Sequence, residues 1–141
     1  RRVEGKTDSW MFRKKEADKM SQDSIETFGG YRKAMELFDL VVRDMNGLKR
    51  EPLCFKLAPQ QVGSADSICA NIEEGHGRTS RKEYARFLDI ARGSARETRG
   101  RYIRMKQWLP AEIVEHRVSL ASEIIGILTS TINTLKRTPR S

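Results

Sequence analysis

The sequence predicts an all-α protein that folds as an antiparallel, up-down-up-down four-helix bundle. Its long segments between glycine and proline residues carry apolar side chains at spacings of three and four, the period of an amphipathic helix. Alternating runs of β-branched residues, which are typical of strands, are absent from the sequence. A chain of 141 residues is long enough for one domain with a useful core. We therefore expect residues 29–137 to form the bundle and residues 138–141 to form a tail.

Residues 1–28 precede the predicted bundle as a polar arm. The arm contains seven basic and six acidic residues, and its only apolar cluster is Trp10, Met11 and Phe12. Such a segment cannot bury enough apolar surface to fold alone. We expect a flexible N-terminal arm.

The first helix is predicted over residues 31–49, where apolar residues fall on one face. These residues are Tyr31, Ala34, Leu37, Phe38, Val41, Val42, Met45 and Leu48. Pro52 breaks the helical pattern, because proline lacks an amide proton and restricts the residue before it. Phe55 and Leu57 follow the break, and we expect them to close this end of the bundle.

The second helix is predicted to carry Pro59 near its first turn, a favoured place for proline. Its inward residues are Val62, Ala65, Ile68, Cys69 and Ile72. Gly75 is predicted to end the helix in the left-handed conformation, which glycine enters without a Cβ penalty. Ser80 and Glu83 form a capping box, in which each side chain bonds the backbone amide of the other residue. A new helix is therefore expected to start directly after Ser80.

The third helix is predicted over residues 81–109 and has the longest inward stripe of the chain. The stripe consists of Tyr84, Phe87, Leu88, Ala91, Ala95, Thr98, Tyr102, Met105 and Leu109. Gly93 and Gly100 each weaken a helix by about 1 kcal/mol relative to alanine, so a compensating reason is expected. We interpret the small residues Ala91, Gly93, Ser94 and Ala95 as a place where another helix approaches closely.

Pro110 is predicted to stop the third helix and to open the fourth, which extends to about Leu135. The inward residues of the fourth helix are Val114, Val118, Ala121, Ile124, Ile125, Leu128, Ile132 and Leu135. Four amphipathic helices joined by short connections are typical of an up-down-up-down bundle.

The charge pattern points to an anionic partner. The net charge is +8 and the pI is near 9.8, which favours nucleic acid or an anionic membrane surface. Residues 78–106 hold ten basic and three acidic residues, for a net charge of +7. Arg92, Arg96 and Arg99 lie on one edge of the predicted helix with Arg81 near the same line, and arginine binds phosphate bidentately. These four arginines are the candidate nucleic-acid-binding residues, and the alternative is a solvated or acid-paired face.

Catalytic and metal-binding patterns are missing from the sequence. His76 and His116 have no second ligand at metal spacing. The pair Asp66 and Ser67 lacks a partner histidine, and no glycine-rich loop follows a strand. Asn71, Glu74 and Arg78 flank a helix end and are interpreted as structural. We therefore predict a non-enzymatic protein with no cofactor and no bound metal.

The predicted location is cytoplasmic, without a membrane partner. No uninterrupted apolar run approaches the roughly 20 residues that cross a bilayer. The first residues lack the apolar region of a secretory signal. Cys54 and Cys69 lie apart without CxxC spacing, and we interpret both as reduced, buried thiols.

The stretch from Gln60 to Glu97 resembles the four-helix bundle family that is also called the 23S ribosomal RNA intervening-sequence proteins. The resemblance covers residues 28–137, departs from the family pattern at Glu73 and Ala95, and does not include the arm. It is carried by Gln60 or Gln61, Ser67, Ile68, Asn71, Ile72, Glu74, Gly75, Gly77, Arg78, Ser80, Phe87, Leu88, Ile90, Ala91, Gly93, Ser94 and Glu97.

This resemblance implies a bacterial homo-oligomer, commonly a homopentamer, without enzymatic activity. Some members of the family are encoded within insertions in ribosomal RNA genes. A similar bundle is the accessory variability protein of diversity-generating retroelements, which associates with a reverse transcriptase and its RNA. Combined with the charge pattern, the resemblance suggests a basic oligomeric scaffold that binds RNA or DNA through the backbone. The alternative is a structural or protein-docking oligomer that does not bind nucleic acid.

Overall fold

The computed structural model describes residues 25–137, and these residues contain α-helices and short 3-10 turns but no strand. The α-helices are α2 (Gly29–Asn46), α3 (Leu57–His76), α4 (Arg81–Arg104) and α5 (Ala111–Arg137), with 3-10 turns at Pro52–Cys54 and Met105–Gln107. The prediction of an all-α protein with four helices is confirmed. Residues 1–24 of the predicted arm and the tail of residues 138–141 lie outside the described residues.

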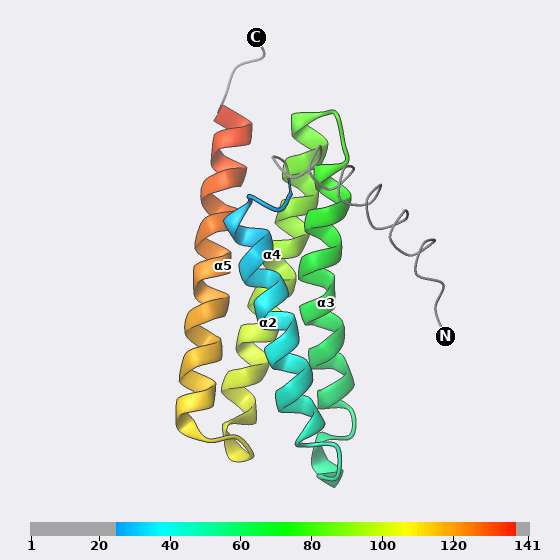
Figure 1. The fold of residues 1–141 in the computed structure, drawn as a ribbon, viewed down its shortest axis with the longest axis vertical. Helices are drawn as coiled ribbons and strands as arrows, with labels where there is room; N and C mark the ends of the chain where they lie inside the picture. The colour runs from blue at the N-terminus through cyan, green and yellow to red at the C-terminus, as the bar shows by residue number, and fades with distance from the viewer. Residues whose placement is uncertain (1–24, 138–141) are drawn as a thin grey trace, which may run out of the picture.

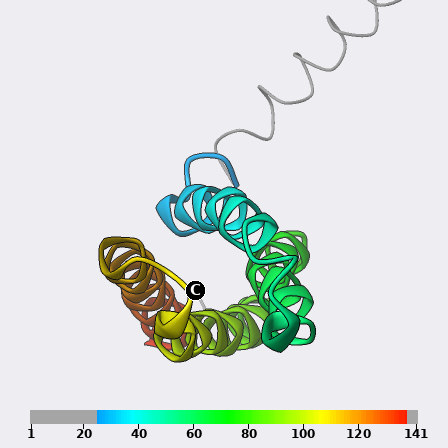
Figure 2. The same ribbon diagram turned by 90° about the horizontal axis from the view of Figure 1, so that it is seen from below.

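The four helices lie side by side, and each short connection is at the opposite end of the bundle from the one before (Figure 1). Seen along the bundle, the helices follow one another around it in chain order (Figure 2). α4 packs extensively on α3 and on α5, whereas α2 packs less extensively on the same two helices. α4 and α2 are therefore diagonal to each other, and the outward side of α4 is far from α2.

The core is built from the apolar stripes that the helical period predicts. Leu37 of α2, Ile68 of α3, Leu88 of α4 and Leu128 of α5 are fully buried, and so is Tyr102. Burial of each large apolar side chain contributes about 1.5–3 kcal/mol. The inward direction of the four stripes agrees with the prediction except at Val42, which is 42% exposed because it lies at the edge of the α2 stripe.

α5 is long and apolar enough, by length and composition alone, to cross a membrane. In the bundle its apolar residues Ile124, Leu128 and Ile132 are buried in the core. Its outward side carries small and polar residues such as Ser119, Gly126 and others that are exposed. Packing against α2 and α4 thus buries only part of the apolar surface of α5.

Gly75 has a different role from the predicted one. α3 continues through Gly75 to His76, and none of the described glycines has a positive φ. Gly75 is buried, and a Cβ atom there would lie 2.8 Å from Cβ of Phe87 and 3.0 Å from Cδ1 of Tyr84. The prediction of a left-handed helix end was wrong: glycine is needed here because α4 approaches α3 too closely for a side chain.

The predicted start of α4 is confirmed, with one half of the capping box formed. The hydroxyl of Ser80 accepts a hydrogen bond from the backbone amide of Glu83 at 3.2 Å. The Glu83 carboxylate does not return to Ser80 but accepts from the Arg86 guanidinium at 3.3 and 3.4 Å. A nearby arginine on the same helix therefore replaces the reciprocal bond.

The end of the bundle between α2 and α3 is closed by Cys54, which is 1% exposed. Phe55 is 77% exposed and Leu57 is half-buried, so the expectation that Phe55 closes this end was wrong. The 3-10 turn Pro52–Cys54 directs the cysteine inward and the following phenylalanine outward. At the far end of α4, the helix tightens into the 3-10 turn Met105–Gln107 before Pro110, slightly earlier than predicted.

Candidate nucleic-acid interface

The basic residues of α4 are directed outward because its other side forms the core. Leu88, Ala91 and Ala95 are buried at helical spacing, so the residues between them face solvent or the neighbouring helices. The four predicted arginines lie along the side of α4 that borders α5. We call these residues and the adjacent lysines the basic seam, which consists of Arg81, Lys82, Arg92, Arg96 and Arg99 of α4 and Lys136 of α5.

Arg92 and Arg99 are held in place by α5. One terminal nitrogen of Arg92 donates to the Thr129 hydroxyl at 3.1 Å, and the other donates to Asp89 at 2.7 Å. Arg99 donates to the Ser122 hydroxyl at 3.1 Å. The Arg92 side chain is only 19% exposed, because it lies against α5. These two residues therefore join α4 to α5 and contribute positive charge to the seam.

Arg81 and Arg96 are exposed, and neither forms a hydrogen bond or ion pair with another described residue. Arg96 lies one turn after Arg92, and Arg81 is the first residue of α4. Both guanidinium groups are available to a ligand. The structure thus divides the four predicted residues into two that are bonded to α5 and two that are free at the surface.

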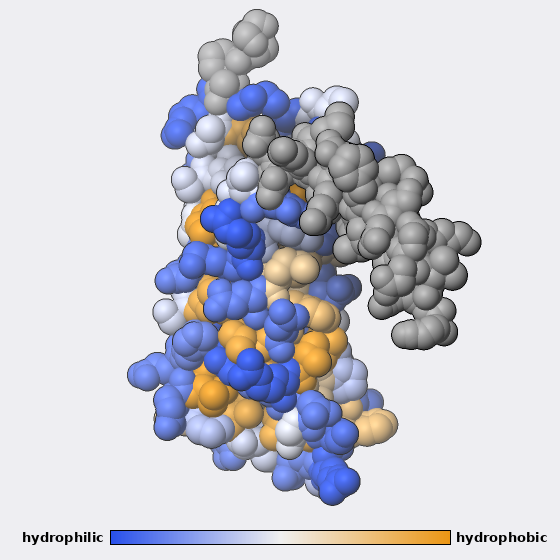
Figure 3. All heavy atoms as spheres, viewed as in Figure 1, coloured by the Kyte–Doolittle hydropathy of each residue, from blue (hydrophilic) through white to orange (hydrophobic). Residues whose placement is uncertain are grey.

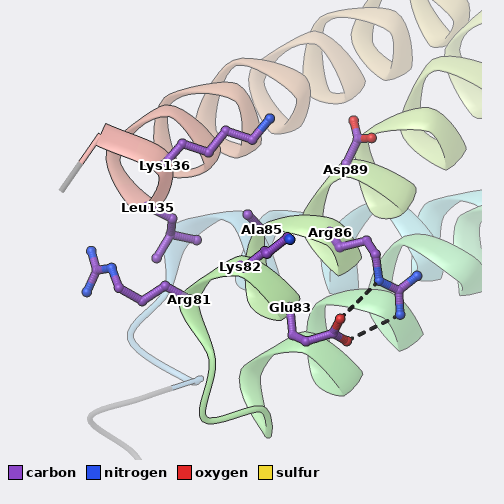
Figure 4. Close-up of a pocket in the computed structure, with 8 residues that line it drawn as sticks. All are labelled: Arg81, Lys82, Glu83, Ala85, Arg86, Asp89, Leu135 and Lys136. Carbon is purple, nitrogen blue, oxygen red and sulfur yellow. Dashed lines mark hydrogen bonds and ion pairs between the residues drawn. The ribbon is translucent and has the colours of Figure 1, made fainter. Parts of the chain in front are cut away.

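A groove of about 650 Å³ lies between the start of α4 and the end of α5 (Figure 4). Ala85 and Leu135 give it an apolar floor. Its other lining residues are charged, namely Arg81, Lys82, Glu83, Arg86, Asp89 and Lys136. Glu83 is paired with Arg86, and Asp89 is paired with Arg92. Arg81, Lys82 and Lys136 therefore remain as cations without an acidic partner in this groove.

Lys82, Arg86 and Lys136 were not among the predicted site residues. Lys136 comes from the last turn of α5, which the fold brings to the first turn of α4. The position of Lys136 beside α4 follows from the topology. Successive helices of a bundle alternate in direction, so the end of one helix lies beside the start of the previous one. The groove could thus have been predicted by combining the charge pattern with the predicted topology.

Comparison with known proteins agrees with this fold. The sequence model of the 23S rRNA-intervening sequence protein family matches residues 26–130. This chain belongs to that family. A solved structure of a protein with unknown function from the S23 ribosomal protein family of Bacteroides thetaiotaomicron is similar to it at 28% identity, with a TM-score of 0.70. The match covers 74% of this chain and 99% of that chain. No curated protein matches this chain.

Two serines of the predicted motif, Ser67 and Ser94, lie where α3 packs on α4. Ser94 donates to the Ser67 hydroxyl at 2.8 Å, and Asn71 donates to the carbonyl of Ser67 at 2.8 Å. Ser94 and Ala95 are buried. The predicted close approach of another helix at these residues is therefore met by α3 of the same chain, while Gly93 faces solvent.

Arg101 is one of the ten basic residues in the segment 78–106, but it is only 8% exposed. It donates to Oε1 of Gln61 at 2.8 Å and to the Ser64 hydroxyl at 3.1 Å, and its Nε has no partner among residues 25–137. Burial lowers the pKa of Arg101. This guanidinium belongs to the hydrogen-bond network between α3 and α4, and so it is not available to nucleic acid.

The polar residues around the α3–α4 turn have structural contacts. Arg78 pairs with Glu74, and its guanidinium lies 5.1 Å from the centre of the Phe87 ring. His76 is half-buried with its Nδ1 at 3.2 Å from the Tyr84 hydroxyl. Burial lowers the pKa of His76. Arg78 and His76 thus hold the turn against α4 through Phe87 and Tyr84.

Asp44 and Arg117 form a buried ion pair that the sequence did not predict. Asp44 accepts from Nε of Arg117 at 2.8 Å, from a second Arg117 nitrogen at 3.0 Å and from the Tyr102 hydroxyl at 2.7 Å. Each of the two charged side chains is 6% exposed. The hydrogen bond to Asp44 raises the pKa of Arg117. This cluster connects α2, α4 and α5, and fixes how these helices are aligned.

Proposed function

We propose that this protein is a non-enzymatic oligomeric scaffold that binds the phosphate backbone of RNA or DNA at the basic seam. The observation that carries the proposal is the presence of exposed, unpaired cations along one seam, with Arg96 in its middle and Arg81 at the groove. Guanidinium groups bind phosphate through two parallel hydrogen bonds. The family name, which refers to a 23S rRNA intervening sequence, supports RNA as the polyanion.

Binding is expected to tolerate different base sequences, because the aromatic residues of α4 are not free to stack on bases. Tyr102 is fully buried and Tyr84 is half-buried. Phe87 is half-buried with the guanidinium groups of Arg78 and Arg86 above its ring, at 5.1 and 4.6 Å from its centre. Proteins that read single-stranded bases use exposed aromatic platforms. The seam instead offers contacts to phosphate.

Self-association is part of the proposal. A homopentamer would repeat the basic seam five times and would hold a long polyanion through many weak contacts. The proposed setting is the cytoplasm, and a reverse-transcriptase ribonucleoprotein is a proposed partner complex. The resemblance of the motif supports the ring and the reverse transcriptase, whereas the charges of the seam support the nucleic acid.

The test compares two double variants that lose the same charge. Arg81→Ala with Arg96→Ala removes free cations of the seam that no folded contact requires. Arg43→Ala with Lys49→Ala removes two exposed cations of α2 and its following turn. In fluorescence anisotropy with a single-stranded RNA at low salt, we expect the seam variant to lose about tenfold or more in affinity and the control to remain near wild type.

Equal affinity of the two variants would show that binding follows net charge and not the seam. Absence of binding by the wild-type protein would favour the second candidate, a protein-docking oligomer. That candidate is favoured by the exposed apolar residues Leu53 and Phe55, which are 75% and 77% exposed. It predicts the same assembly without affinity for RNA.

A further inference from the structure

The surface formed by α2 and α3 combines exposed apolar side chains with acidic residues. Met35 and Val42 are both 42% exposed and lie seven residues apart on the same side of α2. Hydrophobic residues are exposed between hydrophilic residues around the lower half of α2 (Figure 3). We call this surface the acidic face, and it consists of Met35, Asp39, Val42, Asp66 and Glu73.

The three acids of this face lie close together around Cys69. Burial and, in smaller part, the charges of Glu73, Asp66 and Asp39 together raise the pKa of the Cys69 thiol to about 12. Glu73 also accepts a hydrogen bond from the Tyr31 hydroxyl at 2.7 Å, which joins α2 to α3. The acidic face is therefore continuous across the two helices.

The negative charge of the acidic face comes mainly from α3, because α2 carries three basic and three acidic residues. α3 contains three acidic residues and no lysine or arginine. Within residues 25–137, neither Asp39 nor Asp66 forms an ion pair. An exposed apolar surface with one sign of charge is typical of a docking surface for a partner of opposite charge.

The outward side of α4 has the complementary properties. Ile90 and Ile103 are 41% and 47% exposed. Between them Gly93 and Gly100 are seven residues apart, and a Cβ atom at Gly93 would meet nothing within 4 Å. Arg104 is exposed and unpaired among the described residues, and α4 as a whole carries eight basic against three acidic residues. This side is apolar and basic, and its glycines let another helix come close.

We propose that the acidic face of one copy of this chain docks on the outward side of α4, from Ile90 to Arg104, of the next copy. Each copy carries both surfaces, so the contact is head-to-tail and generates a ring when its rotation closes. The contact covers the stretch of α4 that contains Arg96, whereas the groove with Arg81, Lys82 and Lys136 lies at the N-terminal end of α4 and stays outside the contact. This inference rests on the self-association in the proposed function and specifies the surfaces that carry it.

The first part of the test uses sedimentation velocity in the micromolar range with a matched pair of glycine variants. Gly93→Leu and Gly126→Leu both place a side chain on an exposed helix surface where the folded chain leaves space. Neither should lower the melting temperature of the isolated bundle. We expect Gly93→Leu to sediment as a monomer, because leucine separates the two docked surfaces, and Gly126→Leu to assemble like the wild-type protein.

The second part tests charge complementarity. Asp39→Lys with Asp66→Lys makes the acidic face basic, and Arg104→Glu adds an acid beside Glu97 on α4. We expect each variant alone to lose at least about tenfold in assembly affinity. One chain that carries all three substitutions should regain assembly, since its reversed face then meets the reversed α4 of the next copy. Circular dichroism of each variant confirms that its helices are intact.

The outcomes separate this inference from the proposal on which it rests. A wild-type protein that is monomeric throughout would overturn self-association and the inference together. A wild-type assembly that both Gly93→Leu and the charge reversals leave intact would overturn only the assignment of these two surfaces. Loss of assembly in each variant without recovery in the combined variant would contradict the pairing of the acidic face with α4.

Discussion

At the scale of single residues, the alignment of the bundle depends on the buried cluster of Asp44, Arg117 and Tyr102. A buried ion pair is favourable only when its partners and hydrogen bonds are complete, because the desolvation cost of each charge is several kcal/mol. Here the Asp44 carboxylate accepts three hydrogen bonds from the other two residues. The cluster therefore specifies one arrangement of α2, α4 and α5.

Asp44→Ala should lower the free energy of unfolding by about 3–5 kcal/mol, because it leaves the Arg117 guanidinium buried without a counter-charge. Glu36→Ala removes an exposed carboxylate from the same helix and should change stability by no more than about 0.5 kcal/mol. Urea unfolding of both variants measures the difference. A loss below about 1 kcal/mol in Asp44→Ala would mean that the pair does not hold the bundle together.

His76 should make stability depend on pH in a predictable direction. Burial lowers its pKa below the ordinary value of 6.5, so the unfolded chain binds a proton more readily than the folded chain. The stabilising contribution is complete above pH 6.5 and is lost as the pH falls towards the folded pKa. Between about pH 7.5 and 5.5, the wild-type protein should lose more stability than His76→Gln, which does not titrate. Equal losses in the two urea titrations would contradict this assignment.

At the scale of helices, glycines with different surroundings give opposite predictions. Gly75→Ala places a Cβ atom 2.8 Å from Cβ of Phe87, so α4 must shift, at a cost of about 1–3 kcal/mol. Gly126→Ala meets nothing within 4 Å and should stabilise α5 by about 1 kcal/mol. Denaturant unfolding of the two variants under the same conditions tests the contrast. Stabilisation by Gly75→Ala would show that the two helices are not held at this close approach.

The helices could be predicted from the sequence because their apolar period is local information. The Ser80 cap could be predicted for the same reason, since its bond spans three residues. The role of Gly75 could not, because it depends on Phe87 of the neighbouring helix. The pair of Asp44 and Arg117 spans 73 residues and is fixed only once three helices pack.

Only the part of the candidate site that depends on spacing within one helix could be predicted from the sequence. Spacing placed Arg81, Arg92, Arg96 and Arg99 along one side of a helix, and this side borders α5. Spacing alone could not show that Thr129 and Ser122 accept hydrogen bonds from two of these arginines. Nor could it show that Arg101 is buried, because that depends on Gln61 and Ser64 of α3.

At the scale of the whole molecule, positive and negative charge are concentrated on different helices. α3 carries three acidic residues and no basic residue, whereas α4 carries eight basic and three acidic residues. Such a separation of charge gives each of these two helices a strong local electrostatic potential of its own sign. The proposed ring would use the acidic face and the outward side of α4 for assembly, and would leave the groove cations Arg81, Lys82 and Lys136 for a polyanion.

The most direct measurement of nucleic-acid binding by the basic seam is RNA affinity as a function of salt concentration. For the wild-type protein we predict that the logarithm of the affinity falls linearly with the logarithm of the salt concentration, because bound phosphates release counterions. In Arg81→Ala with Arg96→Ala, the slope should flatten by about 0.7 for each lost contact to single-stranded RNA. The control variant Arg43→Ala with Lys49→Ala should keep the wild-type slope. Absence of binding at low salt, or an unchanged slope in the seam variant, would contradict the account.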